Sequence, residues 1–189
     1  MQELSSDIKR VMLYYLNEVI GETGIADLVI DANNRDALNA IHKYLLYPES
    51  IKGIMLYGPV GTGKSILIKT LQRCVKHIYN KGVIEFNAPY LRSNYYQDAP
   101  EEKFTVAYKV HLFRQIIIND IGFERPYSSG EDILQTIMFD RFEQGKVTHG
   151  TTNLTPNEFI DRYNDDKNRM MDRFKLMFQF IEVKGNSFR

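Results

Sequence analysis

The segment Ile54–Leu71, IMLYGPVGTGKSILIKTL, contains an apolar run, a glycine-rich turn, a lysine, a serine and a second apolar run in immediate succession. IMLY has the composition of a short buried strand, and SILIKTL has that of an amphipathic helix. Between them, Gly58, Gly63, Lys64 and Ser65 satisfy the pattern G-x-x-x-x-G-K-[ST]. A strand, a glycine-rich turn and a helix in this order predict a phosphate-binding loop.

The loop has the residue types that ATP with Mg²⁺ requires. Glycines let backbone N–H groups curl around phosphates, and the helix N-terminus adds its positive dipole end. Lys64 is expected to reach the β- and γ-phosphates, and Ser65 to ligate Mg²⁺. The alternative is a tight turn with no ligand. We predict that the cofactor-binding residues are Gly58, Pro59, Val60, Gly61, Thr62, Gly63, Lys64, Ser65 and Ile66.

Short β-rich runs alternate with helical patterns along the rest of the chain. This alternation predicts an α/β fold of parallel βαβ units, in which helices cover both faces of the sheet. The expected strands are GIMLY (53–57), GVIEF (82–86), RQIIIN (114–119), KVTHGTT (146–152) and KLMFQFIEV (175–183), and helices are expected at 65–79, at 131–142, from TPNEF and across KNRMMDRF.

The N-terminal part is expected to be helical. In LSSDIKRVMLYYLNEVIG, apolar residues recur at helical spacing, with Ser5 or Ser6 available as N-cap and Gly21 as a stop. The pattern NNRDALNAIHKYLLYP predicts a second helix that ends at Pro48. We therefore expect one main domain with a small N-terminal helical appendage.

Composition limits the function classes. A chain of 189 residues with 43% apolar content can bury one sizeable core. Lysine plus arginine and aspartate plus glutamate both number 24, so net charge favours neither nucleic acid nor membrane as a partner. The single cysteine, Cys74, lies in an apolar helical run and is expected to be a buried thiol. A polar N-terminus and the lack of a long apolar run predict a cytoplasmic protein without membrane contact.

A hydrolytic site also needs an acidic group at the end of a neighbouring strand, where it holds metal-bound water and polarises the attacking water. In RQIIINDIGFE, three isoleucines mark a buried strand, and Asn119 and Asp120 follow at its carboxyl end. We expect Asp120 to be catalytic and to hold Mg²⁺ together with Ser65 and Asn119. Two alternatives stay open: Asp120 only caps the strand, or Glu124 is the acid.

Further candidate residues follow the next predicted strand. Asn153 could orient the attacking water or sense the γ-phosphate, because its amide both donates and accepts. Alternatively, it begins the turn before the helix signal TPNE. Arg169 and Arg173 lie one helical turn apart and share a face, for which a solvated surface is the alternative reading.

Taken together, GPVGTGKS, IIINDIG, THGTTNLT and RMMDRF resemble the Walker A, Walker B, sensor 1 and arginine-finger boxes of AAA+ ATPases, in that order. The similarity covers roughly residues 28–189 and points to the DnaC/IstB-like branch of bacterial helicase loaders and transposition helpers. It implies a P-loop NTPase fold, a three-layer αβα sandwich with a mainly parallel five-stranded sheet and nucleotide bound between subunits. The catalytic residues would be Asp120, Asn153 and Arg173, with Arg173 reaching a neighbour's γ-phosphate.

The chain departs from the family pattern in two ways. Asn119 stands where the first of two Walker B acids would be, so we expect weak hydrolysis that assembly or DNA stimulates. Helicase loaders also carry a sizeable N-terminal module, for which residues 1–27 would serve in reduced form as a partner-binding element ahead of an ATPase domain at 28–189. No C-terminal helical lid is expected before Arg189.

The leading hypothesis is an ATPase that loads or remodels a DNA-bound partner, such as a replicative helicase or a transposase, and self-assembles through nucleotide-bridged interfaces. The segment 87–107 is expected to be a surface insertion that could bind single-stranded DNA. Within it, Tyr90, Tyr95 and Tyr96 could stack on bases and Arg92 could meet phosphate, although such tyrosines equally often pack a loop.

A second hypothesis is an ATP-dependent binding switch with little or no hydrolysis, which Asn119 favours. A small-molecule kinase is a third, but no arginine cluster or lid for a second substrate is visible in the sequence.

Overall fold

The computed structural model describes residues 2–24, 30–47, 52–95, 105–124, 132–163 and 169–185. The described helices and strands, in chain order, are α1 (Gln2–Thr23), α2 (Arg35–Leu46), β1 (Gly53–Tyr57), α3 (Lys64–Tyr79), β2 (Ile84–Asn87), α4 (Ala88–Asn94), α5 (Val106–Leu112), β3 (Gln115–Ile121), α6 (Ile133–Glu143), β4 (Val147–Thr152), α7 (Pro156–Tyr163), α8 (Arg169–Met177) and β5 (Phe178–Glu182).

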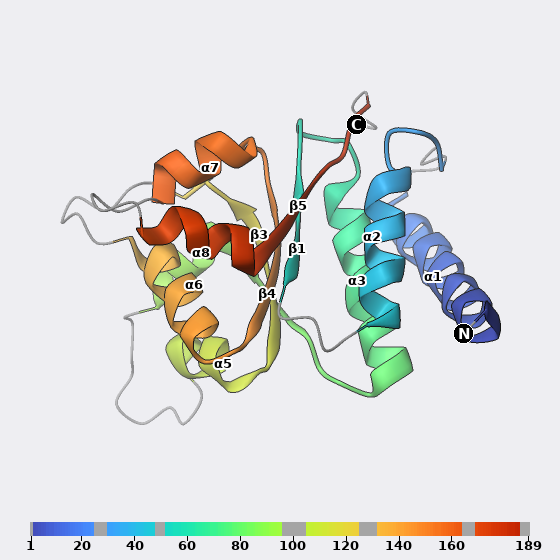
Figure 1. Cartoon of the computed structure of the whole chain (residues 1–189), viewed down its shortest axis with the longest axis horizontal. Helices are drawn as coiled ribbons and strands as arrows, with labels where there is room; N and C mark the ends of the chain where they lie inside the picture. Colours follow the sequence, from blue (N-terminus) through green and yellow to red (C-terminus); the bar gives the residue numbers. More distant parts are fainter. Residues whose placement is uncertain are drawn as a thin grey trace.

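The five strands form one parallel sheet in the order β2-β3-β4-β1-β5. Helices α1, α2 and α3 cover one face of this sheet, and α5, α6, α7 and α8 lie on the other (Figure 1). The molecule is therefore an α/β three-layer sandwich, as the sequence predicted. All strand carboxyl ends meet at one edge, called here the carboxyl edge, and the strand starts form the amino edge.

Successive residues of the central strands point to opposite faces and so divide the core in two. Ile54 and Leu56 pack with α1, α2 and α3, whereas Met55 packs with the helices of the other face. In β3, Ile117 joins the first cluster, and Ile116 and Ile118 join the second. A central strand buried on both faces needs the continuous apolar run that the sequence shows.

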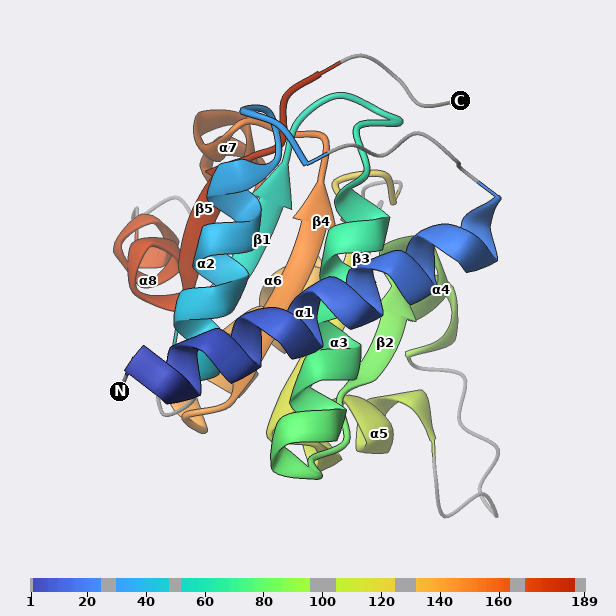
Figure 2. The same ribbon diagram turned by 90° about the vertical axis from the view of Figure 1, so that its right-hand side faces the viewer.

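Helix α1 lies across α3, on the outside of the first layer (Figure 2). Its apolar stripe is buried in the core that α2 and α3 share and consists of Ile8, Met12, Leu16 and Val19. The helix is longer than predicted: Ser5 and Ser6 lie inside it, and Gly21 does not end it. The cause is tertiary, because packing on α3 stabilises helical turns that local propensity alone would leave open.

Part of the segment 87–107 is regular structure rather than a surface insertion. It opens with α4, whose Ala88 and Leu91 are buried in the second core cluster, and α5 begins near its end. At the C-terminal side, the predicted strand 175–183 is shorter, since α8 continues to Met177 and β5 begins at Phe178.

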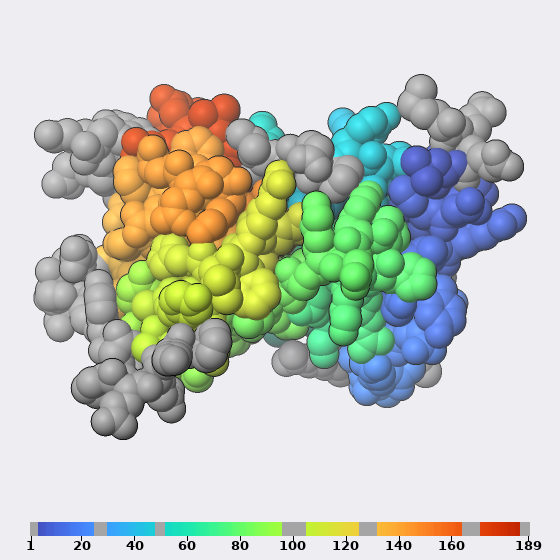
Figure 3. All heavy atoms as spheres, turned by 90° about the horizontal axis from the view of Figure 1, so that it is seen from below, coloured from blue at the N-terminus to red at the C-terminus, as the bar shows by residue number. Residues whose placement is uncertain are grey.

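The amino edge is closed around a buried arginine. Arg141 of α6 is 0% exposed. Its guanidinium donates to Thr148 Oγ1 and to the carbonyl oxygens of Val110, Phe113, Arg114 and Val147. Figure 3 shows the molecule from this side. Burial lowers the pKa of Arg141 to about 10, so the group stays charged at neutral pH.

None of the helices in the described ranges is long and apolar enough to cross a membrane.

Candidate nucleotide-binding site

The glycine-rich loop connects β1 to α3 at the carboxyl edge. Gly58, Gly61 and Gly63 have φ values of 138°, 87° and 90°, in the region that side chains rarely adopt. A Cβ atom on Gly58 would lie 2.4 Å from the carbonyl oxygen of Val183, directly after β5. The glycines are therefore required by backbone conformation and, at Gly58, by close packing as well. Gly63 is also the N-cap of α3, so the amino end of a 16-residue helix faces the loop.

Lys64 is held beneath the loop. Its Nζ donates to the carbonyl oxygens of Gly58 and Pro59, each at 2.7 Å, and the residue is only 7% exposed. Burial lowers the pKa of Lys64, and the charge of Asp120 opposes this shift. Within the described residues Lys64 forms no ion pair. A buried ammonium group whose partners are all neutral favours an anion as ligand, and phosphate suits it.

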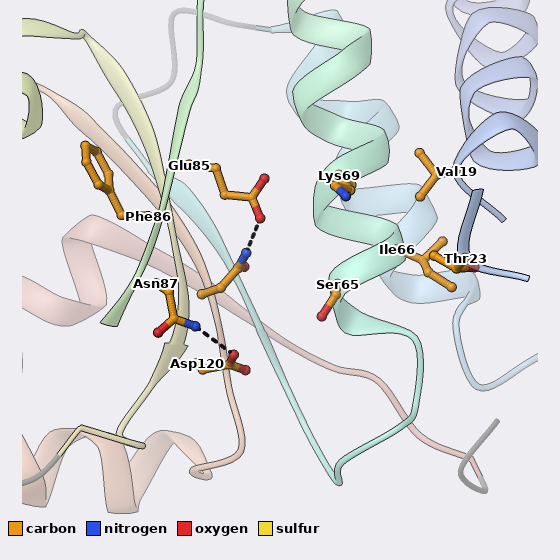
Figure 4. Close-up of a pocket in the computed structure, with 10 residues that line it drawn as sticks. Val19, Thr23, Ser65, Ile66, Lys69, Glu85, Phe86, Asn87 and Asp120 are labelled. Carbon is orange, nitrogen blue, oxygen red and sulfur yellow. Dashed lines mark hydrogen bonds between the residues drawn. The ribbon is translucent and has the colours of Figure 1, made fainter. Parts of the chain in front are cut away.

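A cleft of about 500 Å³ lies beside the loop. Ser65 and Ile66 line it from α3, and Asn119 and Asp120 line it from β3 (Figure 4). The three residues predicted to hold Mg²⁺, Ser65, Asn119 and Asp120, are thus brought to one place. Mg²⁺ in phosphate sites takes few protein ligands besides the phosphates. In the part of the chain that is described, no cluster of three or more His, Cys, Asp or Glu side chains is suited to a metal.

Asp120 has an unusual backbone and a fixed side chain. Its φ of 56° is left-handed, and the ladder between β3 and β4 is irregular between Ile118 and Ile121. The backbone N–H of Asp120 donates to Thr151 Oγ1 at 3.1 Å, and its Oδ2 accepts from Asn87 Nδ2 at 3.2 Å (Figure 4). The irregularity turns the carboxylate into the cleft, where Asn87 orients it.

The side chain of Asn119 bridges two neighbouring strands. Its Oδ1 accepts from Thr151 Oγ1 of β4 at 3.2 Å, and its Nδ2 donates to Glu85 Oε1 of β2 at 2.5 Å. Glu85 also lines the cleft (Figure 4). The carboxyl edge thus carries a polar chain from β2 through β3 to β4, and the carboxylates of Glu85 and Asp120 lie at the same cleft.

Asn153 and Glu124 lie elsewhere. Asn153 is exposed, directly after β4, and is not among the residues that line the cleft. Glu124 is 5% exposed and accepts from Arg162 at 3.0 Å and from the hydroxyl group of Tyr163. Burial and the Glu124 charge raise the pKa of Tyr163. Glu124 therefore ties β3 to α7 and is engaged away from the loop, which disfavours the alternative that it is the acid.

Arg173 lies on α8, on the opposite face of the sheet from α3 (Figure 1). Its Nη2 is 3.2 Å from Glu143 Oε1, and its guanidinium carbon is 4.1 Å from the centre of the Phe139 ring. Both partners belong to α6, and the Arg173 side chain is 30% exposed. Arg169 begins the same helix; its side chain lies outside the described part.

The described candidate DNA-binding residues differ in their exposure. Tyr90 is 51% exposed on α4. The hydroxyl group of Tyr95 is 3.0 Å from His111 Nε2, so Tyr95 packs against α5. Arg92 is partly buried, and Tyr96 lies outside the described residues.

Two residues at the site, Glu85 and Asn87, were missed by the sequence reasoning. A usable signal existed: Glu85 lies near the end of the predicted strand GVIEF and Asn87 follows directly after it, and parallel sheets bind ligands at the carboxyl ends of their strands. Which neighbour each side chain meets depends on the pairing of β2 with β3, in which Asn87 lies beside Asn119.

Comparison of the sequence with protein-family models and with curated proteins finds no match. Solved structures do match. A protein assigned as a primosome component from Streptococcus pyogenes serotype M3 has 22% identity and a TM-score of 0.66, with 85% of each chain covered. The DnaC helicase loader has 17% identity and a TM-score of 0.68 over 82% of this chain and 92% of its own.

A third match is the replication initiator DnaA bound to AMPPCP and single-stranded DNA, with 17% identity and a TM-score of 0.61. The match covers 86% of this chain and half of DnaA (50%). At these identities the likeness concerns the fold. The chain shares its fold with the DnaC helicase loader and with DnaA.

Proposed function

We propose that the chain binds ATP at the loop 58–65 and hydrolyses it slowly, and that it uses this cycle to load or remodel a DNA-bound partner. The observation that carries the proposal is Lys64, a buried ammonium whose partners are all neutral carbonyl oxygens, beneath a glycine loop at a helix N-terminus. This arrangement suits the negatively charged phosphates of a nucleoside triphosphate.

Each site residue has a defined task in this proposal. Loop N–H groups and Lys64 bind the phosphates, and Ser65, Asn119 and Asp120 are the candidates for holding Mg²⁺. When bound, Mg²⁺ would neutralise part of the negative charge on the phosphate oxygens. Asp120, oriented by Asn87, accepts the proton of the attacking water, and Asn153 is proposed to sense the γ-phosphate.

The partner is proposed from the fold. The neighbours include a helicase loader and an initiator bound to single-stranded DNA, so a replicative helicase is the favoured partner and a transposase the other candidate. We also propose self-assembly through nucleotide-bridged interfaces, with direct binding of single-stranded DNA as an additional property. The N-terminal residues 1–27, with Tyr14 59% exposed on α1, are the proposed contact to the partner.

The first experiment measures binding of a fluorescent ATP analogue to the wild type and to Lys64→Ala. Loss of the cation beneath the phosphates should weaken binding at least about 100-fold. Lys76→Ala, which removes an exposed lysine of the same helix that does not line the cleft, is the matched control. Equal affinity of Lys64→Ala and wild type would refute the assignment of the loop.

The second experiment tests Arg173 across subunits. An arginine that stabilises the transferring phosphoryl group from a neighbour contributes roughly 10³ to 10⁵ in rate. Arg173→Ala should keep ATP affinity and lose the concentration-dependent turnover. A mixture of Arg173→Ala with Lys64→Ala should recover activity, because mixed interfaces rebuild intact sites. If both variants still assemble with wild type and the mixture stays inactive, Arg173 does not act in this way.

The second candidate function is an ATP-dependent binding switch with little hydrolysis, favoured by the neutral Asn119 at the metal side of the cleft. ATP turnover measured with and without single-stranded DNA, at several protein concentrations, separates the two. Turnover that rises with either variable supports the ATPase, whereas tight binding without turnover supports the switch.

A further inference from the structure

Glu85 is a carboxylate that the sequence motifs do not assign. It lies on β2 and borders the cleft formed by Ser65, Asn119 and Asp120 (Figure 4). Within the described residues it forms no ion pair, and its one hydrogen-bond partner is Asn119. A charged group that lines a nucleotide cleft without a cationic partner is available for a bound cation.

The orientation of Asn119 follows from its two partners. Thr151 Oγ1 donates to its Oδ1, and its Nδ2 donates to Glu85 Oε1. If the amide were turned over, its oxygen would face a carboxylate oxygen, which is repulsive. The amide oxygen of Asn119 is therefore engaged with β4, and its NH₂ group fixes the carboxylate of Glu85.

Besides Glu85, the side chains that line the cleft include one other carboxylate, that of Asp120. Mg²⁺ binds through oxygen atoms and is usually held by one or two carboxylates together with substrate phosphates. Asn119 occupies the position of the first Walker B acid but has no charge and directs its oxygen at Thr151. Glu85 reaches the same part of the cleft from the neighbouring strand, β2. It pairs with Ile117 of β3, and Asn119 lies two residues further along β3, so the side chains of Glu85 and Asn119 are on the same face of the sheet.

We propose that Glu85 supplies the anionic oxygen for the Mg²⁺ that accompanies the nucleotide, and that Asn119 is a positioning residue for it. The cleft then holds two carboxylates, Glu85 from β2 and Asp120 from β3. This inference rests on the proposed binding of nucleotide with Mg²⁺ at the loop.

The test measures metal affinity rather than turnover. Mn²⁺ binding to the complex of protein and ADP is followed by electron paramagnetic resonance, and the Mg²⁺ concentration for half-maximal binding of a fluorescent ATP analogue is measured in parallel. Glu85→Gln keeps the hydrogen bond from Asn119 and removes only the charge. Loss of a group that supports a metal site typically weakens metal affinity about 10- to 100-fold, and we expect a change in this range.

The double variant Glu85→Gln with Asn119→Asp exchanges the amide and the carboxylate. It should restore most of the metal affinity, which a merely structural role of Glu85 would not do. Glu182→Gln is the control, because it removes the same charge from β5, the other edge strand. Urea unfolding of each variant shows that it is folded.

The outcomes separate this inference from the proposed function. If wild type binds nucleotide, Lys64→Ala does not, and Glu85→Gln has wild-type metal affinity, the inference on Glu85 is overturned and the nucleotide site stands. A double variant no better than Glu85→Gln also overturns it. If wild type binds no nucleotide, both proposals fail.

Discussion

Lys64 and Arg141 are both buried cations whose hydrogen bonds go to neutral oxygen atoms, yet they lie at opposite edges of the sheet. Arg141 makes five hydrogen bonds at the amino edge and is fully enclosed. Lys64 makes two at the carboxyl edge, both to its own loop. An ammonium group has three donors, and two hydrogen bonds of Lys64 are found within the described residues.

The comparison distinguishes a cation with a structural role from one that we propose binds a ligand. The charge of Arg141 is balanced by carbonyl dipoles of three neighbouring segments, so it fixes where α5 ends and where β3 and β4 begin. Lys64 lies under glycines whose positive φ angles other residues rarely adopt, and it has no ion-pair partner among the described residues, which supports its proposed role in binding phosphate. The following predictions test this division, beginning with the largest effect.

Arg141→Met should lower the free energy of unfolding by at least about 4 kcal/mol, because five buried acceptors lose their donor and each costs about 1–3 kcal/mol. Urea unfolding measures the change. Arg10→Met, which removes an arginine with an 80% exposed side chain, is the control and should change stability by less than about 0.5 kcal/mol. A loss below about 1 kcal/mol for Arg141→Met would contradict the structural role of Arg141, because surface residues have effects of that size.

Lys64→Met should change the free energy of unfolding by less than about 1 kcal/mol, because its desolvation cost offsets two hydrogen bonds. Ligand-linked stability should differ more. At 100 times the dissociation constant, a nucleotide stabilises the wild type by about 2.7 kcal/mol, and this gain should vanish in the variant. Urea unfolding with and without an ATP analogue measures both. A variant that is strongly destabilised without ligand would make Lys64 structural, like Arg141.

Because His149 is buried, the free energy of unfolding should decrease as the pH is lowered. Burial, aided by the Arg141 charge, lowers the pKa of His149 from 6.5 to about 3, so the folded state keeps the ring neutral. The unfolded state binds a proton below pH 6.5, and stability therefore falls as pH drops from 6.5 toward 3. The expected loss is about 1.4 kcal/mol per pH unit, or about 2 kcal/mol between pH 6.5 and pH 5.

Unfolding free energies of the wild type and of His149→Gln between pH 5 and pH 8 give this slope by difference. The control is His77→Gln, at a histidine whose ring nitrogen bonds the exposed hydroxyl of Tyr15. Parallel pH curves for wild type and His149→Gln would show that the ring does not contribute.

Glu143→Gln should have the smallest effect, below about 1 kcal/mol and reduced further by salt, because its ion pair with Arg173 is partly exposed. Arg173 keeps its contact with the Phe139 ring in this variant. Thermal unfolding at low and high salt measures the change. A loss above about 2 kcal/mol would make Arg173 a structural residue of α6 and α8 and weaken its proposed role at a subunit interface.

The sequence predicted the parts of the site that are local in the chain. Gly58, Gly63, Lys64 and Ser65 act within one turn, and the positive φ angles that glycine permits are a property of each position. The helix start at Thr155 was local too: its side chain and that of Glu158 cap each other as the TPNE string indicates. Asp120 was predicted at a strand end and lies there, although its catalytic role stays a prediction.

Contacts between strands could not be predicted in this way. Asn87 meets Asp120 and Glu85 meets Asn119 across sequence separations of 33 and 34 residues. These meetings depend on strand order and on register, and a shift by one residue would turn each side chain to the other face. The length of α1 and the helices within 87–107 were missed for a related reason, since burial against distant residues stabilises them.

The sequence by itself determined the α/β alternation, the glycine-rich loop between β1 and α3 and the positions of the polar strand ends, because each is encoded in the spacing of a few neighbouring residues. Only the tertiary structure decided that Arg141 is enclosed, that Arg173 pairs with α6 and that Glu85 lies at the same cleft as Asn119 and Asp120. Those properties depend on which segments, distant in the sequence, surround a side chain, because these neighbours determine its burial and its electrostatic environment.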